Sequence, residues 1–238
     1  MSLDSGLVAY YTMDELSGNL TDQSGNGNTG TATGTTSVDG VVGRGKGRSF
    51  NGSSDYIELG TPASLQLTGA ITVTAWVKWD AAATANDRVV SKYASTPDFG
   101  WELRIDDNPN GQLGFMVSGT GTDTFLAEQS AVFTKSQWIH IAGTYVPSTS
   151  VNIYRDGLLI STNTTSIPAT QYNQSATPVR IGRKGDNTAG LFFFGLMDDV
   201  RIYNRALSAT EINQLALFGV KSFVKNMRPR SFAPGLAR

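Results

Sequence analysis

The sequence contains no cysteine and a single histidine, His140. Without cysteine there can be no disulfide, no thiolate metal site and no cysteine nucleophile. One histidine also rules out a zinc site built from several histidines of the same chain. Disulfide scaffolds, thiol enzymes and zinc sites with several histidine ligands from this chain are therefore excluded.

Long apolar runs are also missing. No stretch approaches the roughly 18 consecutive apolar residues that a membrane-spanning helix needs. The opening residues, MSLDSGLVAYYTMDE, have no basic region followed by an apolar core, so the sequence does not predict a secretory signal peptide there. We expect no membrane span and synthesis in the cytoplasm without a signal peptide.

Acidic residues are absent after Glu211. The net charge of −1 for the whole chain therefore conceals an uneven distribution of charge along the sequence. The basic residues beyond that point are Lys221, Lys225, Arg228, Arg230 and Arg238. An acidic main segment followed by a basic C-terminal segment suggests that the chain has two distinct parts. We predict one domain over residues 1–217 and a separate, partly apolar tail over 218–238.

Glycine is abundant, with 26 residues, and only 16% of the chain is charged. Apolar and polar residues alternate in ITVTAWV from Ile71 and in WIHIA from Trp138, as in half-buried strands. Asp156-Gly157 and Asn110-Gly111 are hairpin turn signals. Helix is favoured only over 208–216, which begins with a capping box. The predicted fold is all-β, with two antiparallel sheets packed face to face.

Residues 20–47 are rich in Gly, Asn, Thr and Ser. Such a composition suits a flexible linker. It also suits a fixed irregular loop, because Asp and Asn side chains bind backbone groups and glycines permit tight reversals. We favour the fixed loop.

Several segments together resemble a known family. They are LVAYYTMDELSGNLTDQSGNGNTGTATG, GRSFNGSSDYIELG, ITVTAWVKW, WIHIAGTYVPSTSVNIYRDGLLI and FGLMDDVRIYNRALSATEI. Their order is similar to that of laminin-G-like, concanavalin A-like jelly rolls. The resemblance implies a β-sandwich of about a dozen strands that is mostly non-catalytic, binds carbohydrate or mediates adhesion, and often holds structural calcium. The family usually has Phe-Asp-Gly where this chain has Phe50-Asn51-Gly52.

Two adjacent aspartates, Asp198 and Asp199, lie in an apolar run and need a neutralising partner. Calcium prefers carboxylate, amide and carbonyl oxygens. Because the resemblance places the first and last strands side by side, we predict a structural Ca2+ site of Asp22, Asn28 and Asp198. In the alternative, one aspartate faces solvent and the other binds backbone amides or pairs with Arg201 or Arg205.

Sugars present apolar faces ringed by hydroxyls, so a glycan site needs aromatic rings beside polar groups. The aromatic residues Trp76 and Trp138 are expected in the core. The predicted ligand-binding residues are Trp79, Tyr93, Trp101, Asp186 and Asn187. The chain lacks the Glu-x-Asp-x-x-Glu pattern of sandwich glucanases, so we expect no enzyme.

The tail combines apolar residues with basic ones. It could bind nucleic acid through phosphates, or be disordered, but we favour an anchor to a protein partner. The predicted partner-binding residues are Phe223, Lys225, Arg228, Arg230 and Phe232. The sequence thus predicts a non-catalytic carbohydrate-recognition module displayed on a larger assembly, at a virion or cell surface. The alternative is a structural subunit, such as a phage decoration or tail protein, docked through this arm.

Overall fold

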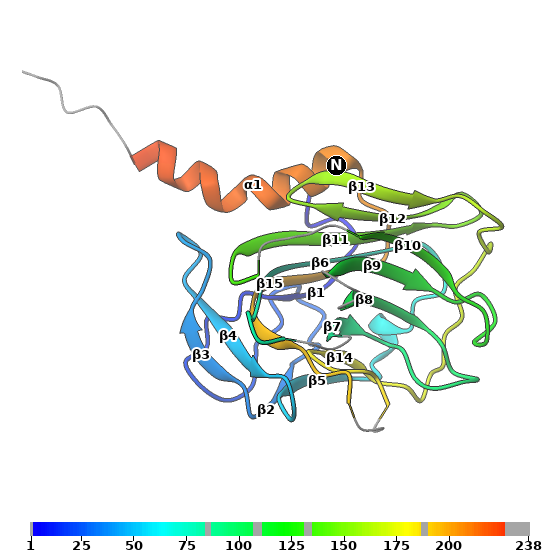
Figure 1. Cartoon of the computed structure of the whole chain (residues 1–238), viewed down its shortest axis with the longest axis horizontal. Helices are drawn as coiled ribbons and strands as arrows, with labels where there is room; N and C mark the ends of the chain where they lie inside the picture. Colours follow the sequence, from blue (N-terminus) through cyan, green and yellow to red (C-terminus); the bar gives the residue numbers. More distant parts are fainter. Residues whose placement is uncertain (1, 84–86, 107–110, 131–134, 187–189, 227–238) are drawn as a thin grey trace, which may run out of the picture.

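A computed structural model describes residues 2–83, 87–106, 111–130, 135–186 and 190–226. Two antiparallel sheets stack face to face (Figure 1), which confirms the predicted sandwich. The eight-stranded sheet runs β13 (Leu158–Asn163), β12 (Ser150–Arg155), β11 (Trp138–Val146), β6 (Ile71–Trp79), β15 (Phe194–Tyr203), β4 (Lys46–Asn51) and β3 (Thr36–Asp39), with β1 (Leu7–Tyr11) beside β15. The seven-stranded sheet runs β10 (Phe125–Ser130), β9 (Gln112–Val117), β8 (Trp101–Asp106), β7 (Asp87–Ser91), β14 (Val179–Ile181), β5 (Tyr56–Gly60) and β2 (Thr31–Thr33).

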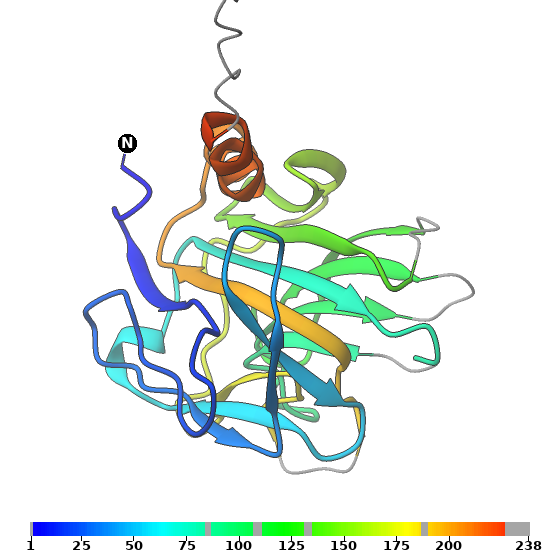
Figure 2. The same ribbon diagram turned by 90° about the vertical axis from the view of Figure 1, so that its left-hand side faces the viewer.

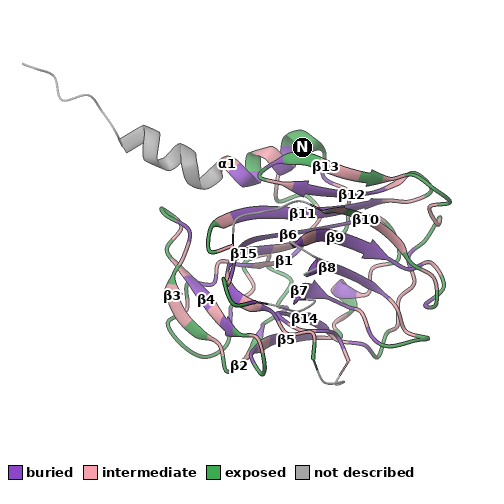
Figure 3. Ribbon diagram, in the orientation of Figure 1, coloured by how far each residue is buried: buried purple, intermediate pink, exposed green. Residues whose placement is uncertain are grey.

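The core lies between the two sheets and follows from the alternation in the strands. Ile71, Val73 and Ala75 of β6 are buried and point inward, so every second residue of that strand belongs to the core. Leu103 and Ile105 of β8 are likewise buried in this core. Figure 3 shows the inner strands of both sheets largely buried, whereas β3 and the loops are more exposed.

The strand pairings agree with the hairpin signals. At the turn between β12 and β13, Asp156 and Gly157 both have positive φ, at 50° and 82°. Strands β8 and β9 also pair, although Asn110 of their turn lies outside the described residues. The first and last strands, β1 and β15, lie side by side as the resemblance implied.

Residues 20–47 form a fixed structure, not a linker. The Asp22 carboxylate accepts hydrogen bonds from the backbone amides of Tyr10, Ser24 and Asn28 at 2.9–3.0 Å. Leu20 and Gly30 form an isolated β-bridge. The segment also contains β2 and β3, which the Gly-rich composition did not indicate.

Helix α1 (Ala209–Asn226) follows β15, and its first turns lie at the β12–β13 end of the eight-stranded sheet (Figure 2). The predicted capping box is present, with Ser208 N donating to Glu211 Oε2 at 2.9 Å. The start of the helix buries Ile212 and Leu215 in a cluster with Ala142, Tyr154, Tyr203 and Leu207. The helix extends ten residues beyond the 208–216 segment predicted from sequence. No described helix is both long and apolar enough to cross a membrane.

Candidate functional site

A groove of about 420 Å³ opens on the outer face of the seven-stranded sheet, and we call it the Arg180 groove. Its walls come from β5, from β14 with the loops before and after it, and from the loop between β7 and β8. The lining residues are Glu58, Ala94, Asp98, Gln174, Ala176, Thr177, Pro178, Arg180, Gly185 and Asp186.

Arg180 forms the centre of this groove because of its position in β14. Its neighbours Val179 and Ile181 point into the core, so the alternation turns Arg180 outward. The guanidinium binds Glu58 Oε2 through Nε at 3.0 Å and Nη2 at 2.8 Å. Its Nη1 also donates to the carbonyl of Asp186 at 2.7 Å. The arginine therefore joins β5 to the loop after β14.

Two residues that the sequence analysis selected lie near each other here: Tyr93 in the loop between β7 and β8, and Asp186 in the loop after β14. Asp186 accepts hydrogen bonds from Ser95 N at 2.8 Å and forms an ion pair with Lys184 at 3.0 Å. The Lys184 ammonium lies 5.4 Å from the centre of the Tyr93 ring. Tyr93 also stacks on Phe99, with ring centroids 4.8 Å apart. One aromatic ring and one carboxylate thus stand together beside the groove.

Asp98 supplies another polar part of the groove. Its carboxylate accepts hydrogen bonds from Gln174 Nε2 at 2.8 Å and from the Tyr172 hydroxyl at 3.4 Å. Sequence reasoning missed Glu58, Arg180, Asp98 and Gln174. The alternating Val179-Arg-Ile-Gly stretch marks Arg180 as outward-facing, but no local pattern marks Gln174.

Paired charges continue over the same face toward its other edge. Arg88 binds Glu102 at 2.6 Å, and Arg104 binds Asp106 at 2.8 Å. Arg104 also reaches Glu128 of β10, at 3.7 Å. Glu102 and Asp106 are therefore held by arginines on one strand face and do not face each other across a cleft.

The predictions for Trp79 and Trp101 as ligand platforms are wrong. Their side chains are 1% and 0% exposed, so neither ring presents a face to solvent. Both belong to the core between the sheets, because each lies at an inward position of its strand. Asn187 lies outside the described residues.

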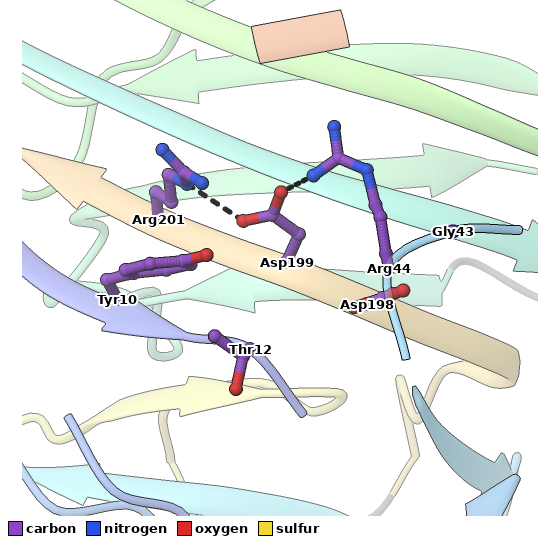
Figure 4. A pocket seen from close by; sticks show the side chains of 7 residues that line it. All are labelled: Tyr10, Thr12, Gly43, Arg44, Asp198, Asp199 and Arg201. Atoms are coloured by element: carbon purple, nitrogen blue, oxygen red, sulfur yellow. Dashed lines mark hydrogen bonds and ion pairs between the residues drawn. The ribbon is translucent and has the colours of Figure 1, made fainter. Parts of the chain in front are cut away.

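A second, smaller pocket of about 210 Å³ lies on the eight-stranded sheet, and we call it the Asp199 pocket (Figure 4). Asp199 sits between two arginines: it forms an ion pair with Arg44 and another with Arg201 Nε at 2.8 Å. The Arg201 guanidinium lies 4.0 Å from the centre of the Tyr10 ring. The alternative to the metal site included pairing with Arg201, which is found for Asp199. Its other part is wrong, because neither aspartate faces solvent: Asp198 is 1% exposed and Asp199 6%.

Asp198 has a different environment from its neighbour. It is 1% exposed, and its Oδ2 accepts a hydrogen bond from Val41 N at 2.9 Å. Burial raises the pKa of Asp198 to about 7, against the opposing effects of the Val41 amide and Arg44. His140 is buried on the same sheet, and burial, with Arg44 and Arg201, lowers its pKa to about 3. His140 is 2% exposed, and its Nδ1 has no hydrogen-bond partner among the described residues.

The three predicted calcium ligands do not fit one shared site. The Asp22 carboxylate accepts hydrogen bonds from three backbone amides and from the Ser24 hydroxyl. The Asn28 side chain donates to Val8 O and accepts from Ser64, whereas Asp198 binds Val41 of another loop. Within the described part of the chain, no three Asp, Glu or His side chains are grouped closely enough to hold a metal ion.

The predicted partner-binding residues fall at the end of the described chain. Phe223 and Lys225 are within helix α1, where the backbone alone is described. Arg228, Arg230 and Phe232 lie outside the described residues. For these five residues partner binding stays a prediction.

The sequence profile of the concanavalin A-like lectin/glucanases superfamily matches residues 51–213. A region of 153 residues is 24% identical to adhesion G-protein coupled receptor V1 of Danio rerio, and it spans 63% of this chain but only 2% of the receptor.

Solved structures show the same fold. The binding domain of Paraclostridial Mosquitocidal Protein 1 superposes with a TM-score of 0.72 at 18% identity, over 90% of this chain and 52% of that one. Domain 4 of AbnA, a GH43 extracellular arabinanase from Geobacillus stearothermophilus in complex with arabinotriose, has a TM-score of 0.66 at 24% identity. That match covers 89% of this chain and 98% of the other, so the two are similar in extent as well as fold.

Proposed function

The chain belongs to the concanavalin A-like lectin/glucanase superfamily, and from this premise we propose that it is a non-catalytic module that recognises carbohydrate in the Arg180 groove. The observation that carries the proposal is the groove itself, with carboxylates, an amide and an arginine turned toward one space. The arabinotriose complex of AbnA domain 4, which matches nearly end to end, supports a glycan as the ligand class.

The charges of the groove favour a neutral glycan. Arg180 is paired with Glu58, and Lys184 with Asp186, so both signs are balanced within the protein. An acidic sugar would have to compete with these carboxylates for the cations. Neutral hydroxyls can instead donate to Glu58, Asp98 and Asp186 and accept from Arg180 without separating a pair.

The same pairing argues against hydrolysis. A glycosidase needs one protonated carboxyl as general acid and a second carboxylate on the other side of the bond. Here Glu58 is bound by Arg180 and Asp186 by Lys184, so both carboxylates are already engaged by cations of the protein. We therefore expect binding without turnover.

Native gel electrophoresis through soluble arabinan, xylan, β-glucan and galactomannan tests this function. We expect at least one polysaccharide to retard the protein, without release of reducing ends. Asp98→Asn should reduce the retardation, because it weakens an acceptor in the groove while keeping the side-chain shape. Release of reducing sugar by the wild type, or unaltered migration in every gel, would contradict the proposal.

A second candidate function is supported by the shape of helix α1. The helix leaves the sandwich and extends beyond its edge (Figure 1), as an arm that docks onto a larger assembly would. In this case the protein is a structural subunit of a virion or cell surface. Removal of residues 218–238 should then abolish incorporation into the assembly while the circular-dichroism spectrum of the sandwich is kept. Normal incorporation of the shortened chain would count against this role.

A further inference from the structure

The Asp199 pocket lies on the opposite sheet from the Arg180 groove, and the proposed glycan site does not use it. Its lining residues come from three separate segments: Tyr10 and Thr12 from β1 and the residue after its end, Gly43 and Arg44 from the turn between β3 and β4, and Asp198, Asp199 and Arg201 from β15. Figure 4 shows Arg201, Asp199 and Arg44 in a row, with the Tyr10 ring and Thr12 on one side.

A β-bulge creates this arrangement. The pairing of β15 with β6 shifts register between Asp198 and Arg201. Asp199 has φ of 50°, a left-handed conformation that is uncommon for a residue other than glycine. Bulges of this kind redirect side chains, often next to binding sites. Here the bulge turns both Asp198 and Asp199 to the pocket, although successive strand residues normally face opposite sides.

The turn between β3 and β4 is fixed over the pocket. Arg44 donates through Nη2 to the carbonyl of Leu215 in helix α1 at 2.9 Å, and its guanidinium lies 5.2 Å from the Trp76 ring. The arginine side chain is only 10% exposed. Its Nε is buried and has no hydrogen-bond partner among the described residues. A buried donor of this kind needs an acceptor.

The pocket is lined by two aspartates and two arginines, so its positive and negative side chains are equal in number. Asp199 is shared by the two arginines, and Asp198 carries a carboxyl bound by one backbone amide. Tyr10 and Thr12 add hydroxyl groups, which both donate and accept. About 210 Å³ corresponds to the liquid volume of roughly seven waters, which limits the ligand to a small molecule.

We propose that the Asp199 pocket is a binding site for a single neutral sugar unit, separate from the Arg180 groove. Hydroxyls of the sugar donate to Asp198 and exchange hydrogen bonds with Tyr10 and Thr12. A small anion would meet Asp198 and Asp199, and a cation would meet Arg44 and Arg201, so a neutral polyhydroxylated ligand suits the pocket better than either.

Amide-shift NMR on the full chain tests this site with methyl glycosides of glucose, galactose, mannose, N-acetylglucosamine and L-arabinose. We expect at least one glycoside to shift the amides of Thr12 and Gly43 in a saturable way. The double variant Tyr10→Phe, Thr12→Val keeps the shape of both side chains and removes two hydroxyls. It should weaken this binding at least about tenfold.

The Arg180 groove provides the matched control. Glu58→Gln should leave the shifts of Thr12 and Gly43 unchanged, and the double variant should still be retarded by the polysaccharide that the wild type binds. The failure of one site is thereby distinguished from the failure of the other. The inference is overturned if none of the five glycosides shifts these amides, if the double variant binds as tightly as the wild type, or if phosphate or acetate binds there and the glycosides do not.

Discussion

Arg180 of β14 and Glu58 of β5 form a two-point ion pair in the groove, with their side chains 5% and 39% exposed. The arginine is thus buried while the carboxylate still reaches solvent. Arg180 also holds the carbonyls of Lys184 and Asp186, so it determines the shape of the loop beside the groove.

Replacing Arg180 by Gln should therefore affect stability as well as binding. The change leaves Glu58 without its cation and two carbonyls with fewer donors, which costs about 2 kcal/mol. Chemical denaturation gives this value directly. Arg155→Gln is the control, because Arg155 forms an exposed pair with Asp156 and its loss should change the free energy of unfolding by less than about 0.5 kcal/mol. Equal stability of the two variants would contradict the assigned role.

The pH dependence of stability should reveal two buried groups with opposite effects. The pKa of Asp198 is about 7 in the folded protein and about 3.9 in unfolded chains, so the folded state binds more protons and stability falls as pH rises between these values. The pKa of His140 is about 3 when folded and about 6.5 when unfolded, so stability rises with pH in that range.

Between pH 4 and 6.5 these two effects cancel in the wild type. Asp198→Asn removes one of them while keeping an acceptor for Val41 N. Relative to the wild type, the variant should gain about 1.4 kcal/mol of stability for each pH unit from 4 to 6.5. Urea unfolding at several pH values measures the difference. A difference that is independent of pH would show that Asp198 titrates normally.

The packing of the two sheets can be tested at Gly143 of β11. A Cβ at this position would lie 2.1 Å from the Phe115 ring of β9, on the facing sheet. Gly143→Ala should destabilise the protein by about 3 kcal/mol, because the core cannot accept the extra carbon. Gly69→Ala is the control, since a Cβ there has no atom within 4 Å. Thermal unfolding of both variants should show a clear loss for Gly143→Ala alone.

Calcium should have little effect on this protein, since the Asp22 carboxylate already accepts four hydrogen bonds. We expect the same melting temperature in EDTA and in millimolar CaCl2. A bound ion at a hundred times its dissociation constant would add about 2.7 kcal/mol and raise the melting temperature visibly. Such a rise would restore the calcium prediction.

The sequence predicted the fold well because strand alternation and turn chemistry are local signals. The alternation over Ile71–Val77 indicates a strand at those residues, and Asp156-Gly157 indicates a turn at that position. The structure has the strand and the turn where they were predicted. The strands β2 and β3 were missed because they are only three and four residues long, with the sequences TAT and TSVD, too short to show a clear alternation.

The candidate site was harder to predict because it depends on contacts between distant segments. Glu58 and Arg180 are 122 positions apart, and Asp98 and Gln174 are 76 apart. Trp79 and Trp101 were misplaced because a tryptophan near a strand end can face either side, and only the register places it inward. Asp186 lines the groove and Tyr93 lies near its neighbour Lys184, but ligand binding by these two residues stays a prediction.

A glycan array probed with the wild type and two matched variants tests the central claim most directly. Glu58 and Glu128 lie toward opposite edges of the same sheet face, with similar side-chain exposure of 39% and 41%. Glu58→Gln should reduce binding to the wild type's neutral glycans about tenfold, because it removes a charged acceptor in the groove. Glu128→Gln should bind the same glycans as the wild type. Equal loss in both variants, or no glycan bound by the wild type, would contradict recognition in the Arg180 groove.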